Sequence, residues 1–169
     1  EKAKIDINNP YVLTKKTSED LCKLFNKKYG IKITILRPSN VYGPKQKNNF
    51  LIPSIINQII NKKNILVNDL KPERDYIYVD DLVDSIIKCL DIKNNFEIIN
   101  IGSGKTYSVK NIIDIIQSIM GTKISIKCKE NIRYNETMKT QADIEKANKI
   151  LNWQPKHSLR DGLIKCINF

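Results

Sequence analysis

Tyr11 and Lys15 are the first residues of this 169-residue chain whose types and spacing could do chemistry. Residues four apart lie on one face of a helix, so the phenol and the ammonium could point at one reacting centre. A phenol has a pKa of about 10, and a nearby ammonium lowers it toward the range that suits general acid–base catalysis. The ammonium can also donate hydrogen bonds to ribose hydroxyls. The pair predicts proton transfer beside a bound nucleotide, and the alternative is a solvated pair at a helix start.

The loop after the apolar segment 31–36 carries a second set of polar groups. It reads Arg-Pro-Ser-Asn-Val-Tyr-Gly-Pro from residue 37 to residue 44. Open α/β sheets bind ligands at the carboxyl ends of their parallel strands, which is where this loop would lie. The Asn40 amide could donate to a phosphate or a sugar hydroxyl, and the alternative is a tight loop without a ligand.

Two arginines could hold phosphate groups. Arg74 comes just before the strand-like segment 76–79, and Arg133 lies in a polar loop between a predicted strand and a predicted helix. A guanidinium can bind phosphate through two parallel hydrogen bonds. Asp80 and Asp81 follow the strand, where acidic side chains cap a helix and complement its dipole, so we expect a structural role for both.

Alternating helical and strand patterns position these residues. The apolar spacing predicts helices at 11–29, 50–61, 80–90, 108–120, 143–151 and from 158 onward, and strands at 31–36, 65–67, 76–79, 98–101 and 124–128. Such alternation predicts an α/β fold, with the end of a larger parallel sheet followed by a small mixed lobe. Trp153 is expected to anchor the core of that lobe, and His157 to lie on the surface.

The composition argues against several classes of protein. The net charge of +11 comes mostly from lysines spread along the whole chain, so dedicated nucleic-acid binding is not predicted. No apolar run of about 18 residues and no basic-then-apolar leader is present, so we expect neither a membrane span nor a signal peptide. The four scattered cysteines form no metal-binding cluster and indicate reduced core thiols in a cytoplasmic protein. The first residue is Glu1, which suggests a piece of a longer protein.

The order of these motifs is more specific than any one of them. Tyr-x-x-x-Lys is followed by Arg-Pro-x-Asn-Val-Tyr-Gly-Pro, Arg-Asp-Tyr-Ile-Tyr-Val-Asp-Asp-Leu, Asn-Ile-Gly-Ser-Gly and Leu-x-Trp-x-Pro. This series resembles the extended short-chain dehydrogenase/reductase family, and within it the NAD-dependent epimerases and dehydratases of nucleotide sugars. The family's glycine-rich phosphate loop and upstream Ser or Thr lie before the position of Asn9, so the resemblance is to the C-terminal portion only.

The resemblance implies a role for each candidate residue and no metal. Tyr11 would be the catalytic acid/base at a sugar hydroxyl. Lys15 would hold the nicotinamide ribose and lower the tyrosine pKa, so both residues would contact the cofactor, NAD or alternatively NADP. Pro38 would contact the nicotinamide end of the cofactor through its backbone.

The same resemblance places three residues on the substrate, a nucleotide-diphosphate sugar. Asn40 would contact its phosphates, and Arg74 and Arg133 would grip the diphosphate from two sides. Residues 1–49 would then be the C-terminal remnant of a NAD-binding Rossmann domain. Residues 50–169 would mainly form a substrate-binding lobe, interleaved with returning Rossmann elements around 74–101.

The leading hypothesis for function is a nucleotide-sugar 4-epimerase that acts by transient oxidation at C4 of the sugar. The alternatives are a 4,6-dehydratase or a decarboxylase of the same family and, from another class, a non-catalytic nucleotide-sugar-binding lobe. We expect the isolated chain to be inactive. The resemblance also implies that the full-length protein is a homodimer whose interface includes the Tyr11 helix.

Overall fold

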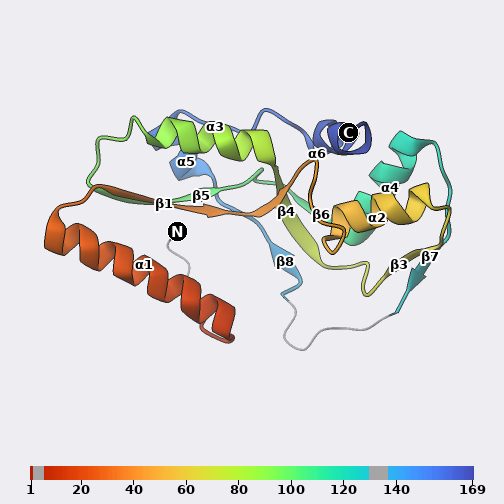
Figure 1. The fold of residues 1–169 in the computed structure, drawn as a ribbon, viewed down its shortest axis with the longest axis horizontal. Coiled ribbons are helices and arrows are strands. Elements are labelled where there is room, and N and C mark those ends of the chain that lie inside the picture. The colour runs from red at the N-terminus through yellow and green to blue at the C-terminus, as the bar shows by residue number, and fades with distance from the viewer. Residues whose placement is uncertain (2–5, 130–136) are drawn as a thin grey trace.

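A computed structural model describes residue 1 and residues 6–129 and 137–169 of the chain. One end holds a parallel strand pair between two helices, and the other end holds a lobe of helices and short strands (Figure 1). The helices are α1 (Pro10–Tyr29), α2 (Leu51–Ile60), α3 (Val79–Cys89), α4 (Val109–Met120), α5 (Glu145–Leu151) and α6 (Leu159–Ile167). The strands are β1 (Ile33–Pro38), β2 (Asn40–Tyr42), β3 (Ile65–Val67), β4 (Glu73–Tyr78), β5 (Phe96–Ile101), β6 (Thr106–Ser108), β7 (Ile126–Cys128) and β8 (Lys139–Thr140). This arrangement confirms the predicted α/β class.

Helix α1 begins and ends where its sequence predicts. The Asn9 side chain accepts a hydrogen bond from the Val12 N–H at 2.9 Å, and Pro10 occupies the first turn, where its missing N–H costs nothing. Gly30 ends the helix in the left-handed conformation, with a φ of +66°, and its N–H donates to the Asn26 carbonyl. None of the 20 residues of α1 is fully buried.

Strands β1 and β5 form the parallel pair at this end of the molecule. Their register runs from Ile33 opposite Phe96 to Pro38 opposite Ile101. Helix α1 packs on one side of β1 and α3 on the other. Both strands therefore end at the same edge, where the loop after Pro38 begins. Strand β1 starts at Ile33, two residues later than the predicted segment.

Strand β4 joins the two ends of the molecule. It pairs with β2 and β8 in parallel and with β6 in the antiparallel direction. The sequence placed Arg74 before this strand, but β4 begins at Glu73 and Arg74 lies within it. Because strand side chains alternate, Arg74 and Tyr76 share one face, and Asp75 and Ile77 share the other.

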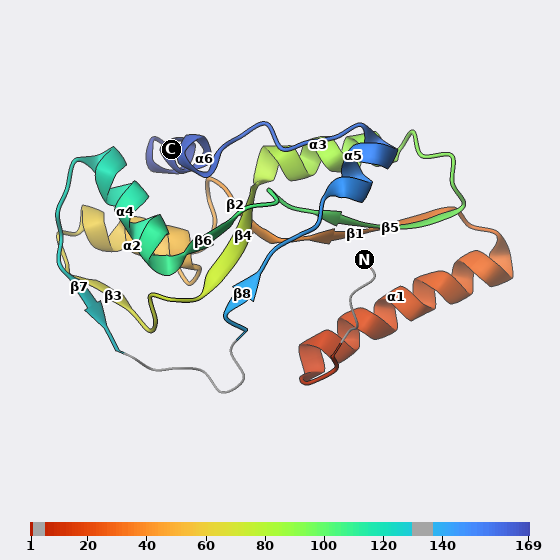
Figure 2. The same ribbon diagram turned by 180° about the vertical axis from the view of Figure 1, so that it is seen from behind.

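Two apolar clusters hold the fold together. The larger one lies in the lobe seen from behind in Figure 2 and consists mainly of isoleucines of α2 and α4 with leucines of α6: Ile52, Ile55, Ile56, Ile59, Ile112, Ile113, Ile116, Leu159 and Leu163. Trp153 is buried, as predicted, but it packs in the other cluster with Ile77, Ile99 and Ile101. It therefore anchors the carboxyl-terminal segment to β4 and β5, and the prediction that it anchors the small lobe was wrong.

Asp81 and His157 also differ from expectation. The Asp81 carboxylate accepts hydrogen bonds from the N–H groups of Lys156 and His157, each at 3.1 Å, and from His157 Nδ1 at 2.9 Å. It therefore fastens the segment before α6. The N-cap position of α3 is Tyr78, and no described side chain caps this helix through a hydrogen bond, so the prediction that Asp80 and Asp81 cap it was wrong. Both residues lie in its first turn, where they complement the helix dipole. The His157 ring lies against Tyr78, with centroids 4.7 Å apart, and is mostly buried. Sequence spacing could not show the contact between Asp81 and His157, because these residues are 76 positions apart.

Two further predictions concern the cysteines and membrane-spanning helices. All four thiols are free, and each is partly buried. Cys89 and Cys166 pack against the two apolar clusters, in line with the expectation of core thiols, whereas Cys22 and Cys128 belong to neither cluster. Within the described residues, no helix is both long and apolar enough to cross a membrane.

Candidate active site

Tyr11 and Lys15 lie on one face of α1, as their spacing predicts. Lys15 Nζ is 5.6 Å from the centroid of the Tyr11 ring. Both side chains line a cavity of about 570 Å³ between α1 and β1, and Pro38 lines the same cavity at the carboxyl end of β1. Tyr11 is 70% exposed, so its phenol is accessible to a reactant. The structure thus brings together the three residues predicted to act on the cofactor side.

An ion pair fixes the direction in which α1 presents this face. Arg37 Nε donates to Glu19 Oε1 at 2.6 Å, and Arg37 Nη2 donates to Glu19 Oε2 at 2.5 Å. Both side chains are mostly buried, and the hydrogen bonds from the guanidinium to Glu19 raise the pKa of Arg37. Because Glu19 lies one helical turn after Lys15, the ion pair sets the rotation of the helix over β1. Sequence reasoning missed this pair, since nothing local links residues 19 and 37.

Asn40 lies at the start of β2, two residues beyond Pro38. Its Nδ2 donates to the Asp75 carbonyl of β4 at 3.0 Å. The residue lines a second cavity, of about 560 Å³, which Phe50 and Tyr76 also line. The segment from Pro38 to Asn40 therefore runs from the Tyr11 cavity to the cavity beside β4.

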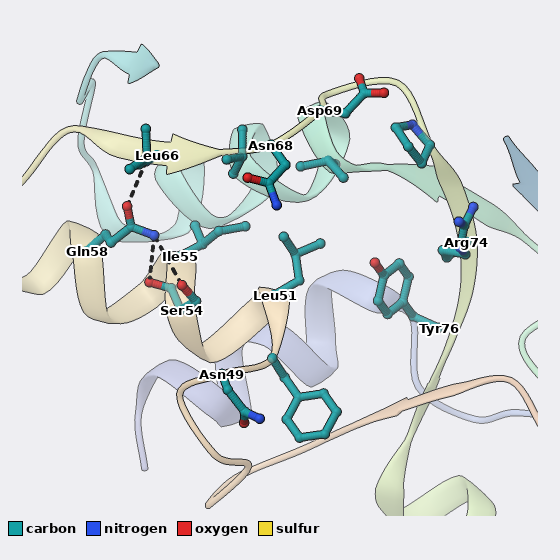
Figure 3. A pocket seen from close by; sticks show the side chains of 14 residues that line it. Asn49, Leu51, Ser54, Ile55, Gln58, Leu66, Asn68, Asp69, Arg74 and Tyr76 are labelled. Carbon is teal, nitrogen blue, oxygen red and sulfur yellow. Dashed lines mark hydrogen bonds between the residues drawn. The ribbon is translucent and has the colours of Figure 1, made fainter. Parts of the chain in front are cut away.

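A third cavity, of about 330 Å³, lies between α2, β3 and β4 (Figure 3). Arg74 and Tyr76 enter it from β4, and Leu51 and Ile55 enter from α2. Gln58 braces the opposite wall, because its Nε2 donates to Ser54 and its Oε1 accepts the Leu66 N–H at 2.7 Å. Tyr76 lines both this cavity and the one beside Asn40, so the two are adjacent.

The chemistry of this third cavity suits an anion with an apolar attachment. The Arg74 guanidinium supplies positive charge, and Arg74 Nη1 donates to the Glu73 carbonyl at 2.9 Å, which fixes one end of the group. Burial raises the pKa of Tyr76 to about 12, so its phenol stays a hydrogen-bond donor at neutral pH. Amide groups of Asn49, Gln58 and Asn68 line the polar wall, and so does the carboxylate of Asp69, whose Oδ1 accepts the Lys71 N–H at 2.9 Å. Arg133, the other predicted phosphate ligand, lies outside the described residues.

Several lining residues were not predicted from the sequence. Leu51, Ile55 and Gln58 read as an ordinary amphipathic helix, and Tyr76 as an ordinary strand residue. The one available signal was the alternation of Arg74 and Tyr76, which places the two side chains on one face of a strand.

The sequence profile described as the NAD dependent epimerase/dehydratase family matches residues 1–102. The chain belongs to this family. The match confirms the family and the Rossmann-type fold class indicated by the motif order. The division into residues 1–49 and 50–169 stays a prediction.

The relatives with assigned activities are nucleotide-sugar enzymes. A UDP-glucuronate 4-epimerase of Thermodesulfobacterium geofontis is 34% identical over 165 residues, which are 95% of this chain and 50% of that protein. A dTDP-4-dehydro-6-deoxyglucose reductase of Escherichia coli is 32% identical over 161 residues, or 93% and 51% of the two chains. The chain thus spans about half the length of the curated relatives it matches.

Solved structures agree. A UDP-glucuronic acid 4-epimerase of Bacillus cereus, in complex with UDP-glucuronic acid and NAD, matches with a TM-score of 0.86 and 31% identity, covering 99% of this chain and 56% of that one. A UDP-glucose 4-epimerase of Thermotoga maritima, with UDP-glucose, matches with a TM-score of 0.86 and 30% identity, covering 94% and 52%.

Proposed function

We propose that this chain is the part of a NAD-dependent nucleotide-sugar 4-epimerase that carries the proton-transfer pair and the substrate-binding residues. The observation that carries the proposal is the succession of three cavities along the path from Tyr11 to Arg74. Tyr11 and Lys15 face the carboxyl end of β1, and the segment from Pro38 to Asn40 leads from there to the cavity that holds Arg74. One elongated ligand could therefore reach a general base at one end and a cation at the other.

Tyr11 would accept the proton of the C4 hydroxyl and later return it. Lys15 lies one helical turn from Tyr11 and would hold ribose hydroxyls of the cofactor. When bound, the nicotinamide cofactor, NAD or alternatively NADP, supplies reversible acceptance of a hydride from C4. The placement of Tyr11, Lys15 and Pro38 around one cavity fits such a group.

The substrate would be bound mainly through its diphosphate. The Arg74 guanidinium would pair with the phosphates, with Asn40 as a neutral donor and Arg133 as a second cation. Leu51 and Ile55 form an apolar wall suited to the flat face of a nucleotide base. Because UDP-sugars occur in the names of two similar epimerases, UDP-glucose and UDP-glucuronic acid are the first substrates to test.

The match to the NAD dependent epimerase/dehydratase family also supports a second candidate, a 4,6-dehydratase or a decarboxylase. Both would use the same oxidation at C4, so Tyr11 and Lys15 would keep their roles. A non-catalytic nucleotide-sugar-binding lobe is the candidate from another class, and it would need Asn40 and Arg74 but not Tyr11. Product analysis of the complete protein separates these: an inverted C4, a 4-keto-6-deoxy sugar, a decarboxylated sugar, or no product despite binding.

The proposal also covers the activity of the isolated chain and the assembly of the complete protein. Since it spans about half of its relatives, we infer that the 169-residue chain alone binds NAD negligibly and has no turnover. The complete protein would be a homodimer. The outer face of α1 supports this, because Leu13, Leu21 and Leu24 are each about half exposed there.

The decisive experiment is Tyr11→Phe in the complete protein. Loss of the acid/base group should lower turnover by about 10²- to 10⁴-fold. Because Tyr11 is exposed, the fold should be unchanged, and nucleotide-sugar binding measured by calorimetry should persist. Retained turnover would remove Tyr11 from the mechanism, and failure to bind UDP-, dTDP- and GDP-sugars alike would overturn the nucleotide-sugar assignment.

A further inference from the structure

Asp75 is a charged residue that the proposed reaction does not use and that the fold nevertheless buries. Its exposed fraction is 1%, and it lies on the face of β4 opposite Arg74 and Tyr76. Removing a carboxylate from water costs free energy unless hydrogen bonds replace the lost hydration. A buried apolar residue would avoid that cost, so the contacts of the carboxylate show what it provides instead.

The two carboxylate oxygens accept five hydrogen bonds from described residues, all from uncharged donors. Oδ1 accepts from the Ser39 hydroxyl at 3.1 Å and from both the N–H and the hydroxyl of Ser103 at 2.8 Å. Oδ2 accepts from the N–H groups of Gly104 at 3.0 Å and Ala142 at 3.1 Å. One side chain thus holds three chain segments that are 28 to 67 residues away in sequence.

The first of these segments carries two of the candidate ligand-binding residues. Ser39 stands between Pro38 and Asn40, and its N–H donates to the Ile101 carbonyl at 2.8 Å. Asn40 also donates its side-chain amide to the Asp75 backbone carbonyl at 3.0 Å. The loop that joins the cofactor side to the substrate side is therefore held to β4 by both the backbone and the side chain of Asp75.

The other two segments, at Gly104 and Ala142, contact the face of β4 opposite Arg74. Ala142 follows β8, in which Thr140 is in register with Arg74. The turn before Gly104 contains Gly102, where an added Cβ would lie 2.6 Å from the Ala142 Cβ and 2.7 Å from Asp75 Oδ2. Only glycine lets the turn approach the carboxylate this closely. The sequence around the carboxylate is thus adapted to its position.

We propose that Asp75 is a positioning residue for nucleotide-sugar binding, whose buried carboxylate fixes Asn40 and the β8 segment relative to Arg74. The proposal rests on the proposed function and extends it to a residue that does not touch the ligand. Several acceptor directions on one carboxylate can hold several separate backbone segments, which an apolar side chain cannot do. The specificity of these contacts would offset the cost of burial.

The test is Asp75→Asn in the complete protein, with UDP-glucuronic acid and UDP-glucose as probes in calorimetry and steady-state kinetics. In either orientation the NH₂ of the asparagine side chain faces backbone N–H groups that it cannot accept, those of Gly104 and Ala142 or that of Ser103, so the segments held by the carboxylate should shift. We expect a dissociation constant and a KM raised by about tenfold or more, as displacement of binding groups produces. We expect kcat to change by less than about threefold, since Tyr11 and Lys15 are not attached to Asp75.

Asp81→Asn is the matched control. Asp81 is 2% exposed and also accepts backbone N–H groups, but those belong to the segment before α6 and not to the site. It should lower the melting temperature and leave nucleotide-sugar affinity within about twofold. Ser39→Ala is the milder variant, because it removes one donor at 3.1 Å and keeps the carboxylate. It should raise the dissociation constant by about threefold with a nearly unchanged melting temperature.

The outcomes separate the two levels of the proposal. Failure of the unmodified protein to bind either UDP-sugar overturns the proposed function. Binding by the unmodified protein with equal affinity for Asp75→Asn, or a loss of affinity as large in Asp81→Asn, overturns the positioning role alone. If Asp75→Asn does not fold, Ser39→Ala decides, and unchanged affinity in that variant contradicts the proposal.

Discussion

Helices α1 and α2 differ sharply in how many of their residues are buried by the rest of the described chain. Helix α2 buries Ile52, Ile55, Ile56 and Ile59, whereas α1, which is twice as long, has no fully buried residue. Yet the proposed proton-transfer pair lies on α1, and the proposed substrate cavity lies beside α2. The proposed substrate side is therefore supported by a packed core. Among the described residues, the side that carries Tyr11 is supported by the Arg37–Glu19 ion pair, by the hydrogen bond from Asn26 to the Asn95 carbonyl and by the contact of α1 with β1.

This difference explains why the two halves of the site should respond differently to change. A cavity backed by a close-packed core keeps its shape, because side chains there have no free volume to move into. A helix held on one face only can rotate or shift when that contact is weakened. Covering the rest of α1 would therefore affect Tyr11 and Lys15 more than Arg74 and Tyr76.

The largest expected effect comes from comparing core truncations in the two helix environments. Ile113→Ala, in the core cluster that α2 shares with α4, should destabilise the chain by about 2–5 kcal/mol, because it leaves a cavity. Leu24→Ala on α1 should cost less than about 1 kcal/mol in the 169-residue chain, because Leu24 is 55% exposed. Urea unfolding of each variant measures both values.

Repeating these measurements on the complete protein sharpens the comparison. If another surface covers the outer face of α1, the cost of Leu24→Ala should rise toward the core value, while that of Ile113→Ala stays the same. An equal, small cost of Leu24→Ala in both forms would show that this face remains in water and would contradict the proposed dimer.

A smaller effect is expected from the ion pair between α1 and β1. Glu19→Gln should cost about 1–3 kcal/mol, because the partly buried Arg37 loses its charged partner. In the complete protein it should also lower kcat by about tenfold with little change in KM, since the rotation of Tyr11 and Lys15 changes and Arg74 does not move. A rise in KM at constant kcat would show that the ion pair supports the substrate side instead. Lys149→Gln, which removes an exposed ion pair with Glu145, is the control and should be neutral.

The smallest effect concerns Tyr76 and alkaline pH. Its pKa is raised by burial to about 12 in the folded chain, whereas an unfolded tyrosine titrates near pH 10. Between about pH 10 and 12 the unfolded chain therefore loses a proton that the folded chain keeps, so stability falls as pH rises. Tyr76→Phe should make this fall less steep, as measured by urea midpoints from pH 9 to 11.5. A slope identical to that of the unmodified chain would show that Tyr76 titrates normally.

The features that could be predicted from the sequence are those encoded over a few residues. The end of α1 at Gly30, the Ser108 cap of α4 and the face shared by Tyr11 and Lys15 all follow from local spacing. The features that could not be predicted depend on distant partners. Asp75 reads as a polar residue between an arginine and a tyrosine, and only the folded chain brings Ala142 to its carboxylate.

The same reason explains the errors. Trp153 lies near the residues of α5 and α6, so its sequence neighbours said nothing of its contact with Ile77 and Ile99. The carbonyl of Asp81 accepts the Trp153 Nε1–H at 3.2 Å, a contact between residues 72 positions apart. For the site, the motif order along the chain was enough to predict Tyr11 and Lys15. The wall around Gln58 could not be predicted, because it forms only when α2 packs against β3.

Strand β1 has one further consequence, which concerns assembly. Among the strands that the structure describes, β1 pairs only with β5, so its other edge offers N–H and C=O groups to an incoming parallel strand. A separately produced polypeptide that ends in a suitable strand could add to this edge and bring its own residues next to Tyr11. The chain could therefore serve as one half of a split enzyme, in which turnover reports that two fused proteins have met.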